Sequence, residues 1–178
     1  MLHAFTKEEK NSLKELMLCK RPDWEVLFHL YYDQKLNPMS FLKSEEFLNI
    51  LTECCIKDYP YTPFADAFHT MRSMLLPVLY LMGSEVPKAD VYHAICTGYG
   101  GLLACLGGHV YKKKVLLTEH GIYTREREEE IIRAKWVQPA FKKQWISFFY
   151  MLSDIIYTRA FSVSALFTNA MLAQIQMG

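Results

Sequence analysis

The sequence predicts an α/β protein in which a helical segment precedes a parallel sheet wound with helices. Two observations support this. Residues 1–88 show only helical periodicity, whereas from residue 89 onward short apolar runs typical of strands alternate with helical patterns. The order strand, helix, strand, helix, strand indicates a parallel sheet. We therefore expect a helical segment at 1–88 and an α/β part of the same domain at 89–178.

The composition is that of a globular chain in which the two signs of charge balance. Apolar residues make up 51% of the 178 residues, and 20 Lys and Arg stand against 19 Asp and Glu. This balance argues against a nucleic-acid binder and gives no reason to expect an anionic membrane surface as a partner. No apolar run is long enough to cross a bilayer. Five cysteines without paired spacing, and no leader-like start, predict a cytoplasmic protein with free thiols.

Four helices are expected in the first segment. Capping residues and apolar periodicity place them from Thr6 to Cys19, from Pro22 through Tyr31, from Ser44 through Leu51, and from Phe64 to Leu81. Pro77 should kink or split the last of these helices. Asn37-Pro38 and residues 59–63 are expected to be connectors between helices.

Three strands and four helices are expected in the second segment. The strands are placed at 91–95, 115–119 and 161–166, and the helices at 102–106, from about 125, from 139 to about 157, and at 168–177. A tight turn is expected at 97–101, and Gly107-Gly108 should end the first of these helices. A sheet of three strands has unprotected edges, which predicts self-association unless the helical segment or further chain covers them.

The principal candidate site lies at the carboxyl end of the second predicted strand. Open α/β sheets bind their ligands beyond the carboxyl ends of the strands. Glu119 and His120 stand there, and a carboxylate with an imidazole can hydrogen-bond sugar hydroxyls or transfer a proton. Gly121 would let the chain turn away at once. The competing interpretation is a histidine that only caps neighbouring backbone groups.

Two further groups could line the same edge of the sheet. Gly98 and Tyr99 follow the first strand and open a helix, whose N-terminus favours an anion or a polar hydroxyl. A tight turn without a ligand explains them equally well. Arg125 or Arg127, in the first turn of the next helix, could bind a phosphate or a carboxylate. Runs of alternating charge more commonly form a solvated surface.

Other types of site lack support in the sequence. His93 and Cys96 have the spacing of a metal-ligand pair, but no second pair accompanies them, so no metal is expected. The glycine-rich turn is not a dinucleotide fingerprint, because Leu103 occupies the position of the third glycine. This counts against a stand-alone nucleotide-binding protein. Trp136 and Trp145 are attributed to core packing rather than to sugar stacking.

Several runs in the second segment are distinctive. They are Leu116–Arg127, Asp90–Ala94, Thr97–Tyr99, and Trp145-Ile146 with Phe148–Tyr150. Together they resemble the Pel-type glycosyltransferases, the PelF group of glycosyltransferase family 4, over about residues 90–178. The resemblance implies a retaining enzyme of GT-B architecture, in which two Rossmann-like domains face a cleft. In that group the N-terminal domain chiefly binds the acceptor, and the C-terminal domain binds the UDP-sugar used in cytoplasmic exopolysaccharide synthesis.

The resemblance also implies a role for this chain and for its site residues. The chain corresponds to half of a GT-B N-terminal domain, a partial Rossmann-like sheet, and would form the acceptor side of the cleft. His120 matches a strand-end histidine that contacts the donor sugar across the cleft, and Glu119, Arg125 and Arg127 would line the same rim.

The expected partners are a UDP-sugar and a carbohydrate acceptor, and no cofactor is expected. The opening strand and the donor-binding domain of such an enzyme have no counterpart in this sequence, so we expect this chain alone to be inactive. The alternative is a non-catalytic interaction module, or a subunit of a split glycosyltransferase whose missing half is a separate partner.

Overall fold

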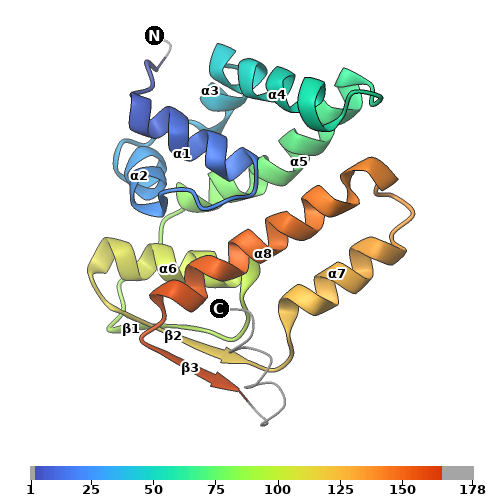
Figure 1. Ribbon diagram of the computed structural model, residues 1–178. Helices are drawn as coiled ribbons and strands as arrows, with labels where there is room; N and C mark the ends of the chain where they lie inside the picture. The colour runs from blue at the N-terminus through green and yellow to red at the C-terminus, as the bar shows by residue number, and fades with distance from the viewer. Residues whose placement is uncertain (1–2, 166–178) are drawn as a thin grey trace. The chain divides into compact units, whose positions relative to one another are not determined.

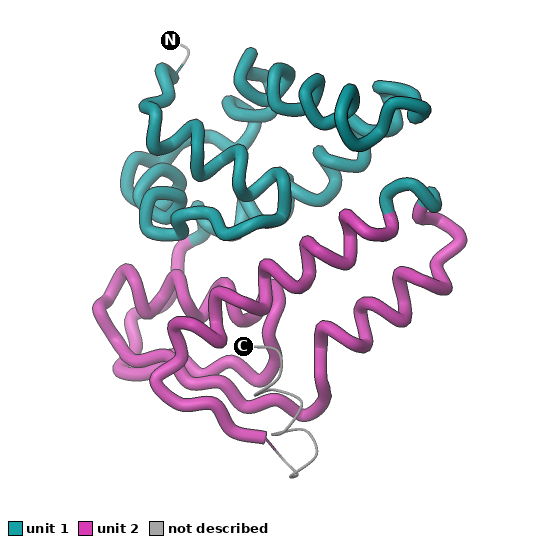
Figure 2. Tube along the Cα trace, in the orientation of Figure 1, with its two compact units in different colours: residues 1–84, 138–141 teal, residues 85–137, 142–178 magenta. Residues whose placement is uncertain are grey.

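A computed structural model describes residues 3–165, which form two compact units (Figure 2). Unit 1 contains the chain up to Ser84 together with Gln138–Phe141. Unit 2 contains Glu85–Val137 and the chain from Lys142 onward. The helix expected at 168–177 lies outside the described residues. None of the described helices is both long enough and apolar enough to cross a membrane.

The described part of unit 1 is helical throughout. Its elements are α1 (Lys7–Met17), α2 (Trp24–Phe28), the π-helix η1 (His29–Asp33), α3 (Pro38–Leu42), α4 (Glu45–Asp58), α5 (Phe64–Met82) and the 3₁₀ turn η2 (Pro139–Phe141) (Figure 1). Pro77 does not split α5. The connector predicted at Asn37-Pro38 is in fact the start of α3, because Asn37 Oδ1 accepts a hydrogen bond from the Met39 N–H at 2.8 Å.

Side-chain caps and buried rings hold the helices of unit 1. Thr6 and Glu9 form a capping box at the start of α1: the Glu9 N–H donates to Thr6 Oγ1, and the Thr6 N–H donates to Glu9 Oε2. In the core, Phe41 meets Phe47 edge to face, with ring centroids 5.6 Å apart. Phe5 contacts Phe41 in the same way at 6.0 Å. These contacts join α3 and α4 to the residues that precede α1.

Unit 2 contains the predicted parallel sheet. Its elements are β1 (Val91–Ala94), α6 (Gly98–Tyr111), β2 (Lys114–Glu119), α7 (Tyr123–Arg133), α8 (Lys142–Arg159) and β3 (Ser162–Ala165). The strands run parallel in the order β1-β2-β3, with His93 beside Leu116 and Leu116 beside Ser162. The structure thus confirms the α/β class, with a partial Rossmann-like sheet preceded by helices.

Two helices of unit 2, α6 and α8, pack on one face of its sheet. Figure 1 shows α6 and α8 on the same side of the strands. This follows because the connections from β1 to β2 and from β2 to β3 step across the sheet in the same direction, and both are expected to be right-handed. Tyr92, Val115 and Leu117 point toward these helices and are buried. Val91 and Ile95, on the opposite face, are 47% and 64% exposed. The sheet therefore has one packed face and one open face within the described part of unit 2.

The glycines near the end of α6 are packing contacts rather than helix stops. The helix continues through Gly107 and Gly108, which were predicted to end it. A Cβ atom on Gly107 would lie 2.4 Å from Cε1 of Tyr92, and one on Gly108 would lie 2.5 Å from Cγ2 of Val115. Their missing side chains let α6 lie directly on β1 and β2. The helix ends instead at Tyr111, and the residue that caps it, Lys112, adopts the left-handed conformation with φ 52°.

Buried thiols predict a loss of stability at alkaline pH. Cys54 on α4 and Cys105 on α6 are buried, and burial raises their pKa values from 9.0 to about 11 and about 12. The folded state therefore favours the protonated thiol. The contribution of each protonated thiol to the free energy of unfolding is complete below pH 9.0, and it is lost as the pH rises through the folded pKa value. Between pH 9.0 and its folded pKa, ionisation of each thiol in the unfolded chain should lower the free energy of unfolding by about 1.4 kcal/mol per pH unit.

Urea denaturation at a series of pH values between neutrality and the folded pKa values measures this decline. Cys105→Ala removes one titrating thiol and should decline less steeply than the wild type. A Cys105→Ala variant whose stability declines as steeply as that of the wild type would show that this thiol does not contribute.

Candidate functional site

The loops that follow β1 and β2 meet at one edge of the sheet. Because the two strands are parallel, their carboxyl ends lie at the same edge. The loop after β1 leads into Gly98 and Tyr99, and β2 is followed directly by His120 and Gly121. The structure therefore brings together the two groups of residues that the sequence predicted for the site.

Gly98 brings the loop after β1 against the first turn of α7. Its φ is +66°, a conformation that residues with a side chain rarely adopt. A Cβ atom at this position would lie only 2.6 Å from Cε1 of Tyr123. Both observations show why glycine occupies this position. A Cβ atom added at Gly121 would lie 2.5 Å from Oε1 of Glu126, a side chain that can move aside more easily than the Tyr123 ring.

Tyr99 packs toward α8 while remaining half-buried. Its ring centroid lies 6.3 Å from that of Phe148 and 6.5 Å from that of Phe149. The ring centroid of Tyr123 also lies 6.0 Å from that of Phe149. Burial, with the nearby Tyr123 as a smaller cause, raises the pKa of Tyr99 to about 12. The Tyr99 hydroxyl is therefore a neutral hydrogen-bonding group at physiological pH.

Glu119 is the buried anchor of β2 rather than a solvent-facing carboxylate. It is 1% exposed, and its Oε2 accepts a hydrogen bond from the hydroxyl of Tyr157 on α8 at 2.5 Å. Burial, followed by this hydrogen bond and the charge of Glu119, raises the pKa of Tyr157 above its usual value. His120, the next residue, is exposed. The imidazole is thus attached to a strand end that α8 holds in place.

A second buried hydrogen bond holds the loop after β1. Thr97 Oγ1 lies 2.8 Å from Ser153 Oγ, and Ser153 Oγ donates to the carbonyl of Phe149. A hydroxyl has one proton, so Thr97 must be the donor to Ser153. Ser153 and Tyr157 stand one turn apart on the same face of α8. A single helix face therefore supports both strand ends of the candidate site. Neither Ser153 nor Tyr157 was predicted from the sequence to belong to it.

The two arginines of the candidate site differ in their surroundings. Arg125, in the first turn of α7, is exposed. Arg127 lies with its guanidinium carbon 5.5 Å from the ring centroid of Tyr123, and its Nη1 is 2.5 Å from Oε2 of Glu130. Arg127 is thus engaged by neighbours on its own helix. Arg125 is the more accessible cation for an anionic ligand.

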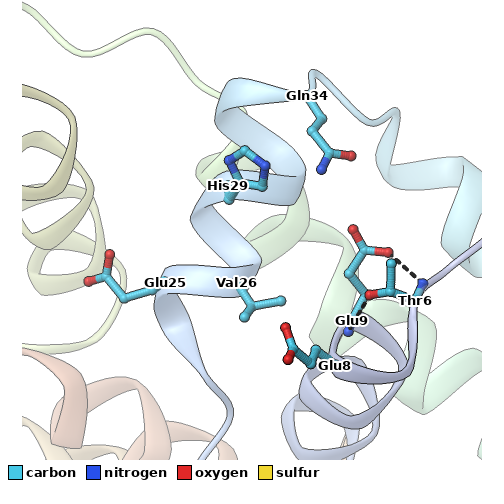
Figure 3. Close-up of a pocket in the computed structure, with 7 residues that line it drawn as sticks. All are labelled: Thr6, Glu8, Glu9, Glu25, Val26, His29 and Gln34. Atoms are coloured by element: carbon cyan, nitrogen blue, oxygen red, sulfur yellow. Dashed lines mark hydrogen bonds between the residues drawn. The ribbon is translucent and has the colours of Figure 1, made fainter.

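Unit 1 contains a separate pocket of about 420 Å³ that none of these residues lines. It is lined by Thr6, Glu8, Glu9, Glu25, Val26, His29 and Gln34 (Figure 3). Glu9 is engaged in the capping box drawn in Figure 3, and His29 Nδ1 lies 2.9 Å from Oδ2 of Asp33. Residues 3–165 contain no group of three or more His, Cys, Asp or Glu side chains arranged to bind a metal ion. We assign this pocket no function.

One known protein family matches almost the whole chain. Residues 2–178 match the family described as a domain of unknown function, DUF3492. The chain belongs to this family. Membership in this family assigns neither a reaction nor a ligand to the sheet edge. The comparisons with curated proteins and with solved structures gave no match.

Proposed function

We propose that this chain forms the acceptor side of the active-site cleft of a retaining GT-B glycosyltransferase, which uses a UDP-sugar in cytoplasmic exopolysaccharide synthesis. The main structural support for this proposal is that His120 is exposed at the carboxyl end of β2, at the same sheet edge as the loop that contains Gly98. Ligands of parallel α/β sheets bind at this edge. The resemblance of Leu116–Arg127 to the Pel-type transferases supports a carbohydrate as the ligand.

The residues at this edge suit a sugar. His120 can donate a hydrogen bond to a hydroxyl or accept one from it, and the neutral Tyr99 hydroxyl can do the same. Arg125 can pair with an anionic group of a substrate. In GT-B enzymes the sugar nucleotide is held by the facing domain. Because positioning of both substrates supplies much of an enzyme's rate, this chain alone should not turn over UDP-glucose.

Calorimetric titration of the purified chain tests the proposal. The ligands are maltohexaose and chitohexaose as model acceptors, and UDP and UDP-glucose as donors. We expect weak binding of at least one oligosaccharide and no binding of either nucleotide. The resemblance makes His120 a contact of the donor sugar, which the facing domain holds. In this chain alone the imidazole is free to bind an oligosaccharide hydroxyl, so His120→Ala should weaken oligosaccharide binding by about tenfold, the effect of losing one hydrogen bond. His29→Ala, which removes an exposed histidine of unit 1, should leave it unchanged.

Three results would contradict this proposal. Binding of UDP-glucose that His120→Ala abolishes would make the edge a nucleotide-sugar site in its own right. Oligosaccharide binding that His120→Ala leaves intact would place the ligand elsewhere. Turnover of UDP-glucose by the purified chain would refute its expected inactivity.

The open face of the sheet favours a second candidate, a non-catalytic interaction module or a subunit of a split transferase. Val91 and Ile95 on this face are exposed, whereas α6 and α8 pack on the opposite face. Parallel sheets are almost always covered on both faces. Concentration-dependent self-association in light scattering, together with no oligosaccharide binding, would favour this candidate over the acceptor-side proposal.

A further inference from the structure

The segment between α7 and α8 exposes a tryptophan that was expected to pack in the core. Trp136 is 66% exposed, and Ile132 near the end of α7 is 57% exposed. Trp136 lies edge-on against Trp145 of α8, with ring centroids 5.7 Å apart. Trp145 in turn stacks on Phe149 at 5.9 Å. The exposed indole therefore rests on the aromatic core of unit 2.

The chain segment that contains Trp136 carries charges of a single sign. From residue 131 to residue 153 the sequence contains no carboxylate, and its cations are Arg133, Lys135, Lys142 and Lys143. The Lys142 ammonium donates a hydrogen bond to the carbonyl of Ile132 at 2.5 Å, so the end of α7 and the start of α8 are adjacent. We call Ile132, Arg133, Lys135, Trp136, Lys142 and Lys143 the Trp136 patch. The net charge of +1 for the whole chain conceals it.

We propose that the Trp136 patch binds the headgroup region of an anionic lipid bilayer. Tryptophan is enriched at membrane–water interfaces because its ring is apolar and its N–H can donate a hydrogen bond. Lysines beside it are attracted to anionic headgroups. Ile132 adds aliphatic surface that can enter the same boundary. The attachment is to the surface of the bilayer and needs no spanning helix.

Other anionic partners fit the patch less well. Single-stranded nucleic acids bind along grooves in which several rings stack on successive bases. Here Trp136 offers one well-exposed ring, and Trp145 is its support rather than a second platform. Arg133, the residue best suited to a phosphate contact, is also paired with Glu129 at 3.4 Å. The combination of one indole, one aliphatic side chain and lysines matches a lipid interface. This inference does not depend on the proposed transferase function.

Flotation of the full chain with lipid vesicles tests the inference. The vesicles contain phosphatidylcholine alone, or phosphatidylcholine with about one third phosphatidylglycerol. We expect binding to the anionic vesicles at low salt, and weaker binding at high salt because the attraction is screened. Lys135→Gln combined with Lys143→Gln should lower the partition coefficient about 25-fold, since each lysine contributes about fivefold. Trp136→Ala should weaken binding as well.

Control variants distinguish vesicle binding by the Trp136 patch from binding by any exposed lysine or aromatic ring. Lys57→Gln with Lys88→Gln removes two exposed lysines outside the patch, and Tyr61→Ala removes a ring that is 99% exposed in unit 1. Both controls should bind vesicles as the wild type does. The inference is overturned if the chain does not bind anionic vesicles, or if the Lys135/Lys143 variant binds as tightly as its control. Patch-dependent binding of oligo(dT) without vesicle binding would also overturn it.

Discussion

Gly107→Ala should lower the free energy of unfolding by about 2 kcal/mol, although alanine is the better helix former by about 1 kcal/mol. The added methyl group would lie 2.4 Å from the ring of Tyr92. That ring cannot move aside easily, because the Tyr92 hydroxyl donates to the carbonyl of Pro87 at 2.6 Å and the ring stacks on Tyr111. The substitution must therefore push α6 away from β1. Urea denaturation at neutral pH measures the effect.

Gly100→Ala in the same helix is the matched control. Gly100 is exposed, and its added Cβ would meet only Sγ of Cys96 at 3.2 Å. The gain in helix propensity should then dominate, leaving this variant as stable as the wild type or more stable by up to about 1 kcal/mol. If both variants changed stability equally, close packing of α6 on the sheet would not be the reason for glycine at position 107.

Tyr157→Phe should cost about 2–3 kcal/mol, because it removes a hydrogen bond to a buried carboxylate. Glu119 is 1% exposed, so water cannot readily replace the lost donor. Tyr150→Phe is the control on the same helix: its hydroxyl donates to Glu128 at 2.9 Å at an exposed position, and its loss should cost less than about 1 kcal/mol.

A double-mutant cycle that combines Tyr157→Phe with Glu119→Leu, each of which removes one partner of the hydrogen bond, isolates the contact between the two side chains. Because the residues are in direct contact, we expect a coupling energy above about 1 kcal/mol. Purely additive losses would show that the hydrogen bond does not hold the end of β2. The anchor would then not account for the position of His120.

The sequence predicted the strands well and the ends of the helices less well. Short apolar runs bounded by charged or glycine residues located β1 and β2 to within one residue. The extent of α6 was wrong because a glycine that ends a helix and a glycine that allows close packing look identical in sequence. Only the position of Tyr92 beside Gly107 distinguishes the two. Asn37 was likewise read as part of a connector although it caps α3.

The position of the candidate site at the sheet edge could be predicted from the sequence, but the buried hydrogen bonds that hold its residues in place could not. Parallel strands bring the residues after β1 and β2 to one edge, so the nearness of Gly98 to the start of α7 follows from topology. The burial of Glu119 depends on Tyr157, 38 residues away, and Thr97 is held by Ser153, 56 residues away. No local pattern encodes such pairs. Trp136 was misassigned because helical spacing does not reveal which ring lies beyond the packed surface.

Binding of a carbohydrate where the loops after β1 and β2 meet can be observed residue by residue. The most direct measurement is mapping of backbone amide shifts in the isotope-labelled chain during titration with maltohexaose and chitohexaose. We expect the largest shifts at Gly98, Tyr99, His120 and Gly121, and we expect His120→Ala to suppress them. Shifts centred on the unit 1 pocket, or no shifts at the sheet edge at saturating ligand, would contradict this expectation.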